Sequence, residues 1–312
     1  MKKVLFALAA VVALAACSKE QTLVTPQPDA IGFGTPFIEN STRVDYSTPG
    51  ALTAFNVYGT VTGTAGTVNI YEGVEVTKTK KENDDIGDAG SWWYAAGDAQ
   101  YWIPGASYNF AAIVDATVAT KDTYHMPLTL TTQADDAMYL KDMLYATATA
   151  SVNAEGTPSA NPVNFNFSHL LSKVKFTVTS NAMGGYYHTV TGIKVSNFET
   201  GTYTIADSTW AGVTAKDVVF AEIANVTSAT GALSNAELLL VPNAATFNVT
   251  FTVDLYKNGT KLGTETKTIP VDTDLVKGNS YNFTIDCSVG NPIKFGVTND
   301  PTWGATTDVT IQ

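Results

Sequence analysis

Apolar and polar side chains alternate with a period of two along most of this chain. Clear examples are residues 55–58, 174–178, 247–253 and 309–311. Because successive side chains of a β-strand point to opposite faces of a sheet, this alternation predicts strands with one buried and one solvated face. Glycine, asparagine and proline separate the runs, as they do between strands. The pattern predicts an all-β protein with little helix, although residues 135–145 have room for one or two helical turns.

Two stretches of the chain repeat. The pattern G-x-S-Y-N-F occurs at residues 105–110 and again at 278–283, each time opening a predicted strand after a turn glycine. Earlier in each half, a strand with an F-x-V core runs into a tyrosine and then a glycine, at residues 55–59 and 251–259. The repetition predicts that one domain plan is used twice. A turn-rich stretch at residues 153–162 marks the boundary between two predicted domains, residues 51–160 and residues 161–312.

The first seventeen residues have the features of a bacterial lipoprotein export signal. Lys2 and Lys3 precede an apolar run at residues 4–13, and Leu-Ala-Ala then leads into Cys17. The run is too short to remain as a membrane-spanning helix, and small residues before the cysteine suit a signal peptidase. We therefore expect residues 1–16 to be removed and Cys17 to become the lipid-modified (palmitate-carrying) first residue. A permanent transmembrane anchor is the alternative.

Charge and cysteine content narrow the class of protein. The chain has 18 basic and 29 acidic residues. Loss of Lys2 and Lys3 with the signal leaves a formal charge of −13 on about 295 residues. This acidity argues against a nucleic-acid partner and suits a cell-surface protein. The length suggests two domains. With Cys17 acylated, Cys287 has no partner for a disulfide, so we expect Cys287 to be a small core residue.

Residues 165–178 resemble the F-x-H-x-L-S-K-V-x-F-x-V signature of the fimbrillin-like (Mfa-like) family, whose members are subunits of type V pili. Other landmarks follow the order of that family, at residues 31–33, 42–43, 101–105, 142–146, 238–242, 293–295 and 303. The resemblance implies two tandem transthyretin-like (Ig-like Greek-key) β-sandwich domains. It also implies a non-enzymatic structural subunit of a surface pilus that serves adhesion, lipid-anchored in the outer membrane as a precursor and later part of the fimbrium.

The family further implies assembly by donor-strand exchange. Arg43 is the only arginine in the chain and follows the candidate first strand, residues 31–38, within a tether and cleavage loop at 17–50. An arginine-specific protease cutting between Arg43 and Val44 would release that strand and open a groove for a neighbouring subunit. An ordinary solvated loop charge is the alternative reading of Arg43.

The resemblance assigns the donor strand to the C-terminal residues near 305–312, with Val309 and Ile311 as apolar anchors. The alternative is that both side chains complete their own sheet. The expected partners are homologous pilin subunits in a homo- or hetero-polymer, the outer-membrane lipid, the protease, and a receptor on a host or bacterial surface.

Catalytic and metal-binding patterns are weak. His125, His169 and His188 lie in different segments, and no zinc, thiol, nucleophile-elbow or phosphate-loop motif occurs. We interpret His169 as a packed structural residue and the acidic run at 82–88 as a solvated hairpin tip instead of a calcium loop. We therefore expect no metal, no cofactor and no enzymatic activity.

An aromatic cluster supports a second hypothesis. Trp92, Trp93 and Trp102, together with two nearby tyrosines, would suit a surface lipoprotein that binds glycans for a polysaccharide-uptake system. Such a protein stacks sugar rings on exposed indole faces. Burial of these rings in the core would favour the structural interpretation.

Overall fold

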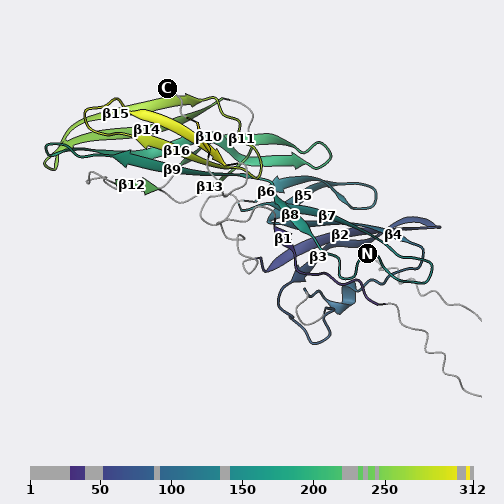
Figure 1. Ribbon diagram of the computed structural model, residues 1–312. Coiled ribbons are helices and arrows are strands. Elements are labelled where there is room, and N and C mark those ends of the chain that lie inside the picture. The colour runs from purple at the N-terminus through teal and green to yellow at the C-terminus, as the bar shows by residue number, and fades with distance from the viewer. Residues whose placement is uncertain are drawn as a thin grey trace, which may run out of the picture.

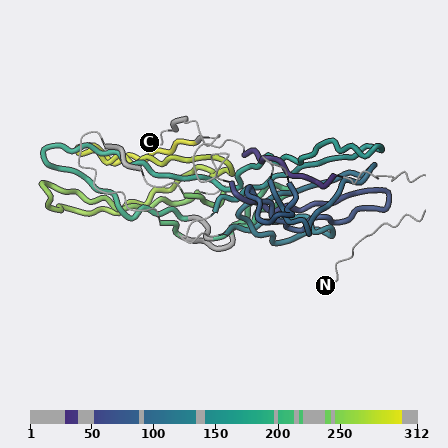
Figure 2. The backbone as a smooth tube through the Cα atoms, turned by 90° about the horizontal axis from the view of Figure 1, so that it is seen from below, coloured from purple at the N-terminus to yellow at the C-terminus, as the bar shows by residue number. Residues whose placement is uncertain are grey.

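The computed structural model describes residues 29–38, 52–87, 92–133, 141–219, 231–234, 238–242, 246–300 and 307–309. These residues form an elongated β protein with its N-terminal part at one end and its C-terminal part at the other (Figures 1 and 2). The all-β prediction is confirmed, because the helical residues in the described part of the chain are confined to one 3-10 turn, Ala96–Asp98. Of the segment 135–145, residues 135–140 lie outside the described residues, and strand β7 begins at residue 144.

The N-terminal part is built on one six-stranded sheet. Five of its strands are antiparallel to their neighbours, whereas β1 pairs with β8 in parallel. Alternate residues of these strands face one buried cluster, which we call the first core. The order across the sheet is β1 (Phe37–Ile38), β8 (Asn166–His169), β7 (Leu144–Ser151), β4 (Ser107–Val114), β2 (Ala54–Gly63) and β3 (Gly66–Thr77).

The C-terminal part contains two sheets that bury a second core between them. One sheet has the order β15 (Thr260–Val271), β14 (Phe247–Lys257), β10 (Tyr186–Thr204), β6 (Pro127–Thr132) and β5 (Ala116–Lys121), with β11 (Thr209–Val219) also paired to β10. The other has the order β12 (Gly231–Ser234), β9 (Ser172–Ser180), β16 (Ser280–Asp286), β17 (Lys294–Asp300) and β18 (Thr307–Val309), with β13 (Leu238–Leu240) also paired to β9.

Strand β10 links the two parts of the molecule. Its first residues pair with β14 at the C-terminal end, and its last residues, 202–204, pair with β6. The β5–β6 hairpin therefore extends this sheet to the N-terminal part, where it lies beside β7 and β8 (Figure 1). A third buried cluster joins Leu130 of β6 and Tyr203 of β10 to side chains of β2, β4, β13 and two connecting segments: Tyr58, Ala111, Ile113, Leu239, Met143, Leu170 and Leu171.

The repeated sequence pattern forms the same local structure twice. Gly105 and Gly278 both have a positive φ, of 75° and 73°. The Tyr108 hydroxyl accepts the Ile103 backbone N–H at 2.7 Å, and the Tyr281 hydroxyl accepts the Val276 N–H at 2.8 Å. Each hydroxyl also donates to a backbone carbonyl seven residues earlier, in Tyr101 and Asp274. The repeat is thus a tyrosine that closes the turn before its own strand.

We expect Tyr281→Phe to lower the free energy of unfolding by about 1–2 kcal/mol, because the Val276 N–H loses its acceptor in a part-buried site. Urea unfolding followed by circular dichroism measures the change. Tyr124→Phe, in an exposed side chain, is the matched control and should leave the midpoint unchanged. Equal midpoints for both variants would show that the turn does not depend on this hydroxyl.

Two further expectations concern packed side chains. Cys287 is buried in the second core, as predicted, and burial raises the pKa of its thiol. His169 is buried with Nδ1 3.0 Å from the Asp142 carboxylate, so the packed-histidine interpretation is confirmed. Burial raises the pKa of Asp142, and the hydrogen bond from His169 opposes that shift. Both groups are structural.

Candidate strand-exchange site

The N-terminal segment 30–38 lies between two other segments of the first core. On one side it runs parallel to residues 163–167, with Gly34 N–H donating to the Val163 carbonyl at 2.9 Å and Phe37 N–H donating to the Phe165 carbonyl at 2.9 Å. Val163 N–H donates back to Gly32 at 2.8 Å. These bonds extend the sheet by one segment beyond β8.

On its other side the same segment contacts residues 92–101. Ile31 N–H donates to the Gln100 carbonyl at 2.9 Å, and Trp92 N–H donates to the Phe33 carbonyl at 3.1 Å. The two flanking segments are separated in sequence by about sixty residues, and segment 30–38 connects them. Removing it would leave main-chain donors and acceptors unpaired on both sides.

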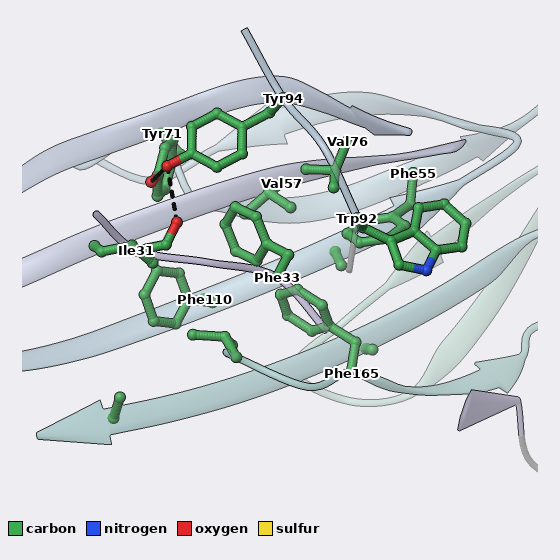
Figure 3. Packing of buried hydrophobic residues seen from close by; sticks show 14 of the residues in the cluster. Ile31, Phe33, Phe55, Val57, Tyr71, Val76, Trp92, Tyr94, Phe110 and Phe165 are labelled. Atoms are coloured by element: carbon green, nitrogen blue, oxygen red, sulfur yellow. Dashed lines mark hydrogen bonds between the residues drawn. The ribbon is translucent and has the colours of Figure 1, made fainter. Parts of the chain in front are cut away.

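Side chains of this segment alternate between the core and solvent. Ile31 and Phe33 have no exposed surface and Ile38 is buried, whereas Phe37 is 61% exposed. The period of two changes phase at Gly34: Ile31 and Phe33 are buried before it, and Pro36 and Ile38 are buried after it, with Thr35 and Phe37 exposed. The buried side chains point into the first core (Figure 3).

Phe33 lies at the centre of a cage of aromatic rings. Four of the surrounding rings meet it edge to face, and the ring of Phe165 is stacked at 22°. Edge-to-face and offset arrangements of this kind are the favourable geometries for aromatic pairs. The centroid distances are 5.5 Å to Tyr94, 5.6 Å to Tyr71, 6.0 Å to Phe165, 6.3 Å to Phe110 and 6.5 Å to Phe55.

A pair of buried tyrosines holds the backbone of the same segment. The Tyr94 hydroxyl donates to the Ile31 carbonyl at 2.8 Å, and the Tyr71 hydroxyl donates to the Tyr94 hydroxyl at 3.4 Å (Figure 3). Burial raises the pKa of both phenols, so each remains a neutral donor. We call the space that segment 30–38 occupies between its two flanking segments the groove. Tyr94 in this groove thus holds the Ile31 carbonyl, two residues before the ring of Phe33.

Several residues singled out in the sequence lie outside the described residues. These are Cys17, Arg43, Val44 and Ile311. The backbone of Val309 is described at the end of β18, where it lies opposite Val297 of β17. Residues 307–309 therefore pair with their own sheet in this structure.

The tryptophans proposed for glycan binding do not share an exposed face. Trp92 and Trp102 are each 3% exposed, and they pack against Phe55 and Tyr108 at centroid distances of 5.0 and 4.7 Å. Trp93 is half-buried, and Lys80 Nζ lies 4.7 Å from its ring centroid. These rings cannot present a common platform to a sugar while the core is intact.

Sequence reasoning missed the roles of Tyr71 and Tyr94. Tyr94 is one of the two tyrosines of the aromatic cluster predicted from the sequence, whereas Tyr71 lies outside that cluster. The available signal was the W-W-Y run itself, whose alternation directs residues 92 and 94 to the same side. Because both are buried beside segment 30–38, that run lines the groove.

Among the described residues, no group of three or more histidine, cysteine or acidic side chains is placed to hold a metal ion. None of their helices has the length and apolar character needed to cross a membrane.

Solved structures with a similar fold come from Bacteroides species. A fimbrial protein of Bacteroides vulgatus has 16% identity and a TM-score of 0.61, with 88% of this chain and 99% of that chain covered. A cell adhesion protein of Bacteroides ovatus has 16% identity and a TM-score of 0.53, covering 92% and 99%. One from Bacteroides uniformis has 17% identity and a TM-score of 0.51, covering 89% and 99%. These likenesses establish a shared fold.

Sequence comparison carries the assignment further. No curated protein matches the chain. The profile of the fimbrillin-like family matches residues 42–301, which is most of the sequence. The chain therefore belongs to the fimbrillin-like family.

Proposed function

We propose that the protein is a structural subunit of a type V pilus, exported as a lipoprotein and polymerised by protease-triggered strand exchange. Its family is one of structural fimbrial proteins and not of enzymes. The observation that carries the proposal is the position of segment 30–38, which supplies the central ring of the first core and precedes the only arginine of the chain. The division into two β-sandwich domains, 51–160 and 161–312, stays part of this proposal. The two separate buried cores support a division into two, while Val163, Phe165 and Phe167, beyond residue 160, belong to the first core.

Cleavage after Arg43 would convert an internal strand into a separate peptide. That peptide would then be held only by hydrogen bonds and by the packing of Ile31, Phe33 and Ile38. The body would already have folded around it, so its loss would leave a shaped apolar groove with unpaired backbone groups. A strand from another subunit would fill the apolar groove and pair these backbone groups.

Acylation of Cys17 would set the order of anchoring, cleavage and release. With Cys17 acylated, the uncut precursor is held at the outer membrane, and the cut frees the body together with the groove. The donor in this scheme is the C-terminal segment with Val309 and Ile311. Its pairing through β18 is limited to residues 307–309 in the described part, and a short edge pairing of this kind is readily exchanged.

The comparisons support a role in adhesion at the cell surface. The solved relatives include a fimbrial protein and two cell adhesion proteins. A receptor on a host or bacterial surface belongs to the proposal for the same reason. The glycan-uptake alternative has less support, because two of its three tryptophans lie in the core.

Intact-mass and N-terminal analysis of the native protein tests the proposal. We expect a membrane form that begins at acylated Cys17 and a fibre form that begins at Val44. If every molecule in shed fibres began at Cys17, cleavage could not be the trigger for assembly. Loss of the lipid mass in a Cys17→Ala variant, with the protein released from membranes, checks the anchor separately.

A further inference from the structure

The groove around segment 30–38 also constrains which partner fits it. Building on the proposed strand exchange, we infer that the groove accepts a strand of a different polypeptide that carries a phenylalanine in register with Phe33. We further infer that it does not stably accept the 305–312 segment of a second copy. In a fibre, the groove of this subunit would then be filled by a strand from a different kind of subunit.

The size of the cage limits which side chain fits at the Phe33 register. Phe33 has no exposed surface and is enclosed by five rings at centroid distances between 5.5 and 6.5 Å. Valine or isoleucine at this register would leave a cavity lined by aromatic carbon, which is costly. An indole would add volume to a space that is already closed. A phenyl ring is the side chain that fits.

Hydrogen bonds in the groove favour one direction of the incoming strand. Tyr94 donates to the carbonyl two residues before the caged ring, and Tyr71 donates in turn to Tyr94. An incoming strand that lacked a carbonyl at this place would leave a buried hydroxyl without an acceptor. A strand running parallel to residues 163–167, as segment 30–38 does, presents its carbonyls in the required order.

The sequence of the candidate donor does not match this cage. Residues 305–312 contain Val309 and Ile311 as their apolar positions and no aromatic residue. Whichever of the two occupied the Phe33 register, the cage would be underfilled. The donor of this chain is therefore suited to a different groove, and the groove of this chain is suited to a different donor.

Peptide exchange on the cleaved full chain tests the inference. The protein is cut with an arginine-specific endoprotease and challenged with excess synthetic peptides, and native mass spectrometry follows complex formation and dissociation. The peptide of residues 29–38 should enter the groove. Its Phe33→Leu variant should dissociate about ten-fold faster or more, since the cavity costs over 1 kcal/mol. The reversed sequence and the 305–312 peptide should form no lasting complex.

The outcomes separate the inference from the proposed function. If the 29–38 peptide itself never replaces the native segment, strand exchange in this protein is contradicted. If it does, but the 305–312 or Phe33→Leu peptide dissociates as slowly, the inference is overturned.

A variant of the groove checks the part played by the tyrosine pair. The Tyr94→Phe body should release the 29–38 peptide about ten-fold faster, because it loses the bond to the Ile31 carbonyl. Tyr124→Phe, at an exposed site, should not change the release rate. Equal release rates from both variants would show that the Tyr94 hydroxyl does not determine how long the peptide stays bound.

Discussion

Replacing Phe33 by alanine is expected to lower the free energy of unfolding by about 3–5 kcal/mol, the range for truncating a fully buried phenylalanine. The ring has no exposed surface and touches aromatic side chains from β2, β3 and β4. Its removal would leave these rings around an empty space that rigid aromatic neighbours close only in part. Denaturant unfolding of the uncleaved protein, followed by tryptophan fluorescence, measures the loss.

Phe37→Ala is the matched control for this prediction. The same residue type lies four positions further along the same strand, but its side chain is 61% exposed. A substitution at such a surface position should change stability by no more than about 0.5 kcal/mol. A loss at Phe33 as small as the loss at Phe37 would contradict the central position of segment 30–38 in the core.

Replacing Arg43 by lysine is expected to abolish fibre formation without changing the fold. Lysine keeps the positive charge of the loop but is not a substrate for an arginine-specific protease. The precursor should therefore remain at the membrane in its uncut, lipid-bearing form, with its own first strand still in the groove. Electron microscopy of surface fibres and the mass of the membrane-bound protein together give the result.

The same variant has two informative readouts. Its unfolding midpoint should equal that of the natural protein, because the charge of residue 43 is preserved. Normal fibres assembled from Arg43→Lys would contradict cleavage at this position. Restoring an arginine at the neighbouring position in an Arg43→Lys, Val44→Arg double variant should restore both cleavage and fibres.

Much of the fold could be read from local patterns. Alternation located the strands around Phe55, Val174 and Phe251, and each of these residues is buried. The repeated tyrosine motif gave two equivalent turns, because its hydrogen bonds join residues only five and seven positions apart. The sequence also predicts a first strand at 31–38, where the structure forms strand β1 at Phe37–Ile38 and isolated bridges at Ala30 and Phe33.

The partners of that strand could not be read in the same way. Segment 30–38 pairs with residues near 165, about 130 positions away, and alternation reports which face of a strand is buried but not which strand lies beside it. The aromatic run at 92–94 illustrates a related limit. Composition shows that rings are present, whereas only the fold decides whether Trp92 faces a sugar or Phe55.

The long strand β10 has a consequence for a fibre under tension. It is covalently continuous from its pairing with β14 at one end to its pairing with β6 near the other part of the molecule. A pulling force along the long axis of the body would therefore load the hydrogen bonds of β10 with β14 and β6 in shear, and the short connections from β4 to β5 and from β8 to β9 would share that load. The subunit should stretch little and transmit force as a stiff rod, where two domains on a flexible linker would first swing into line.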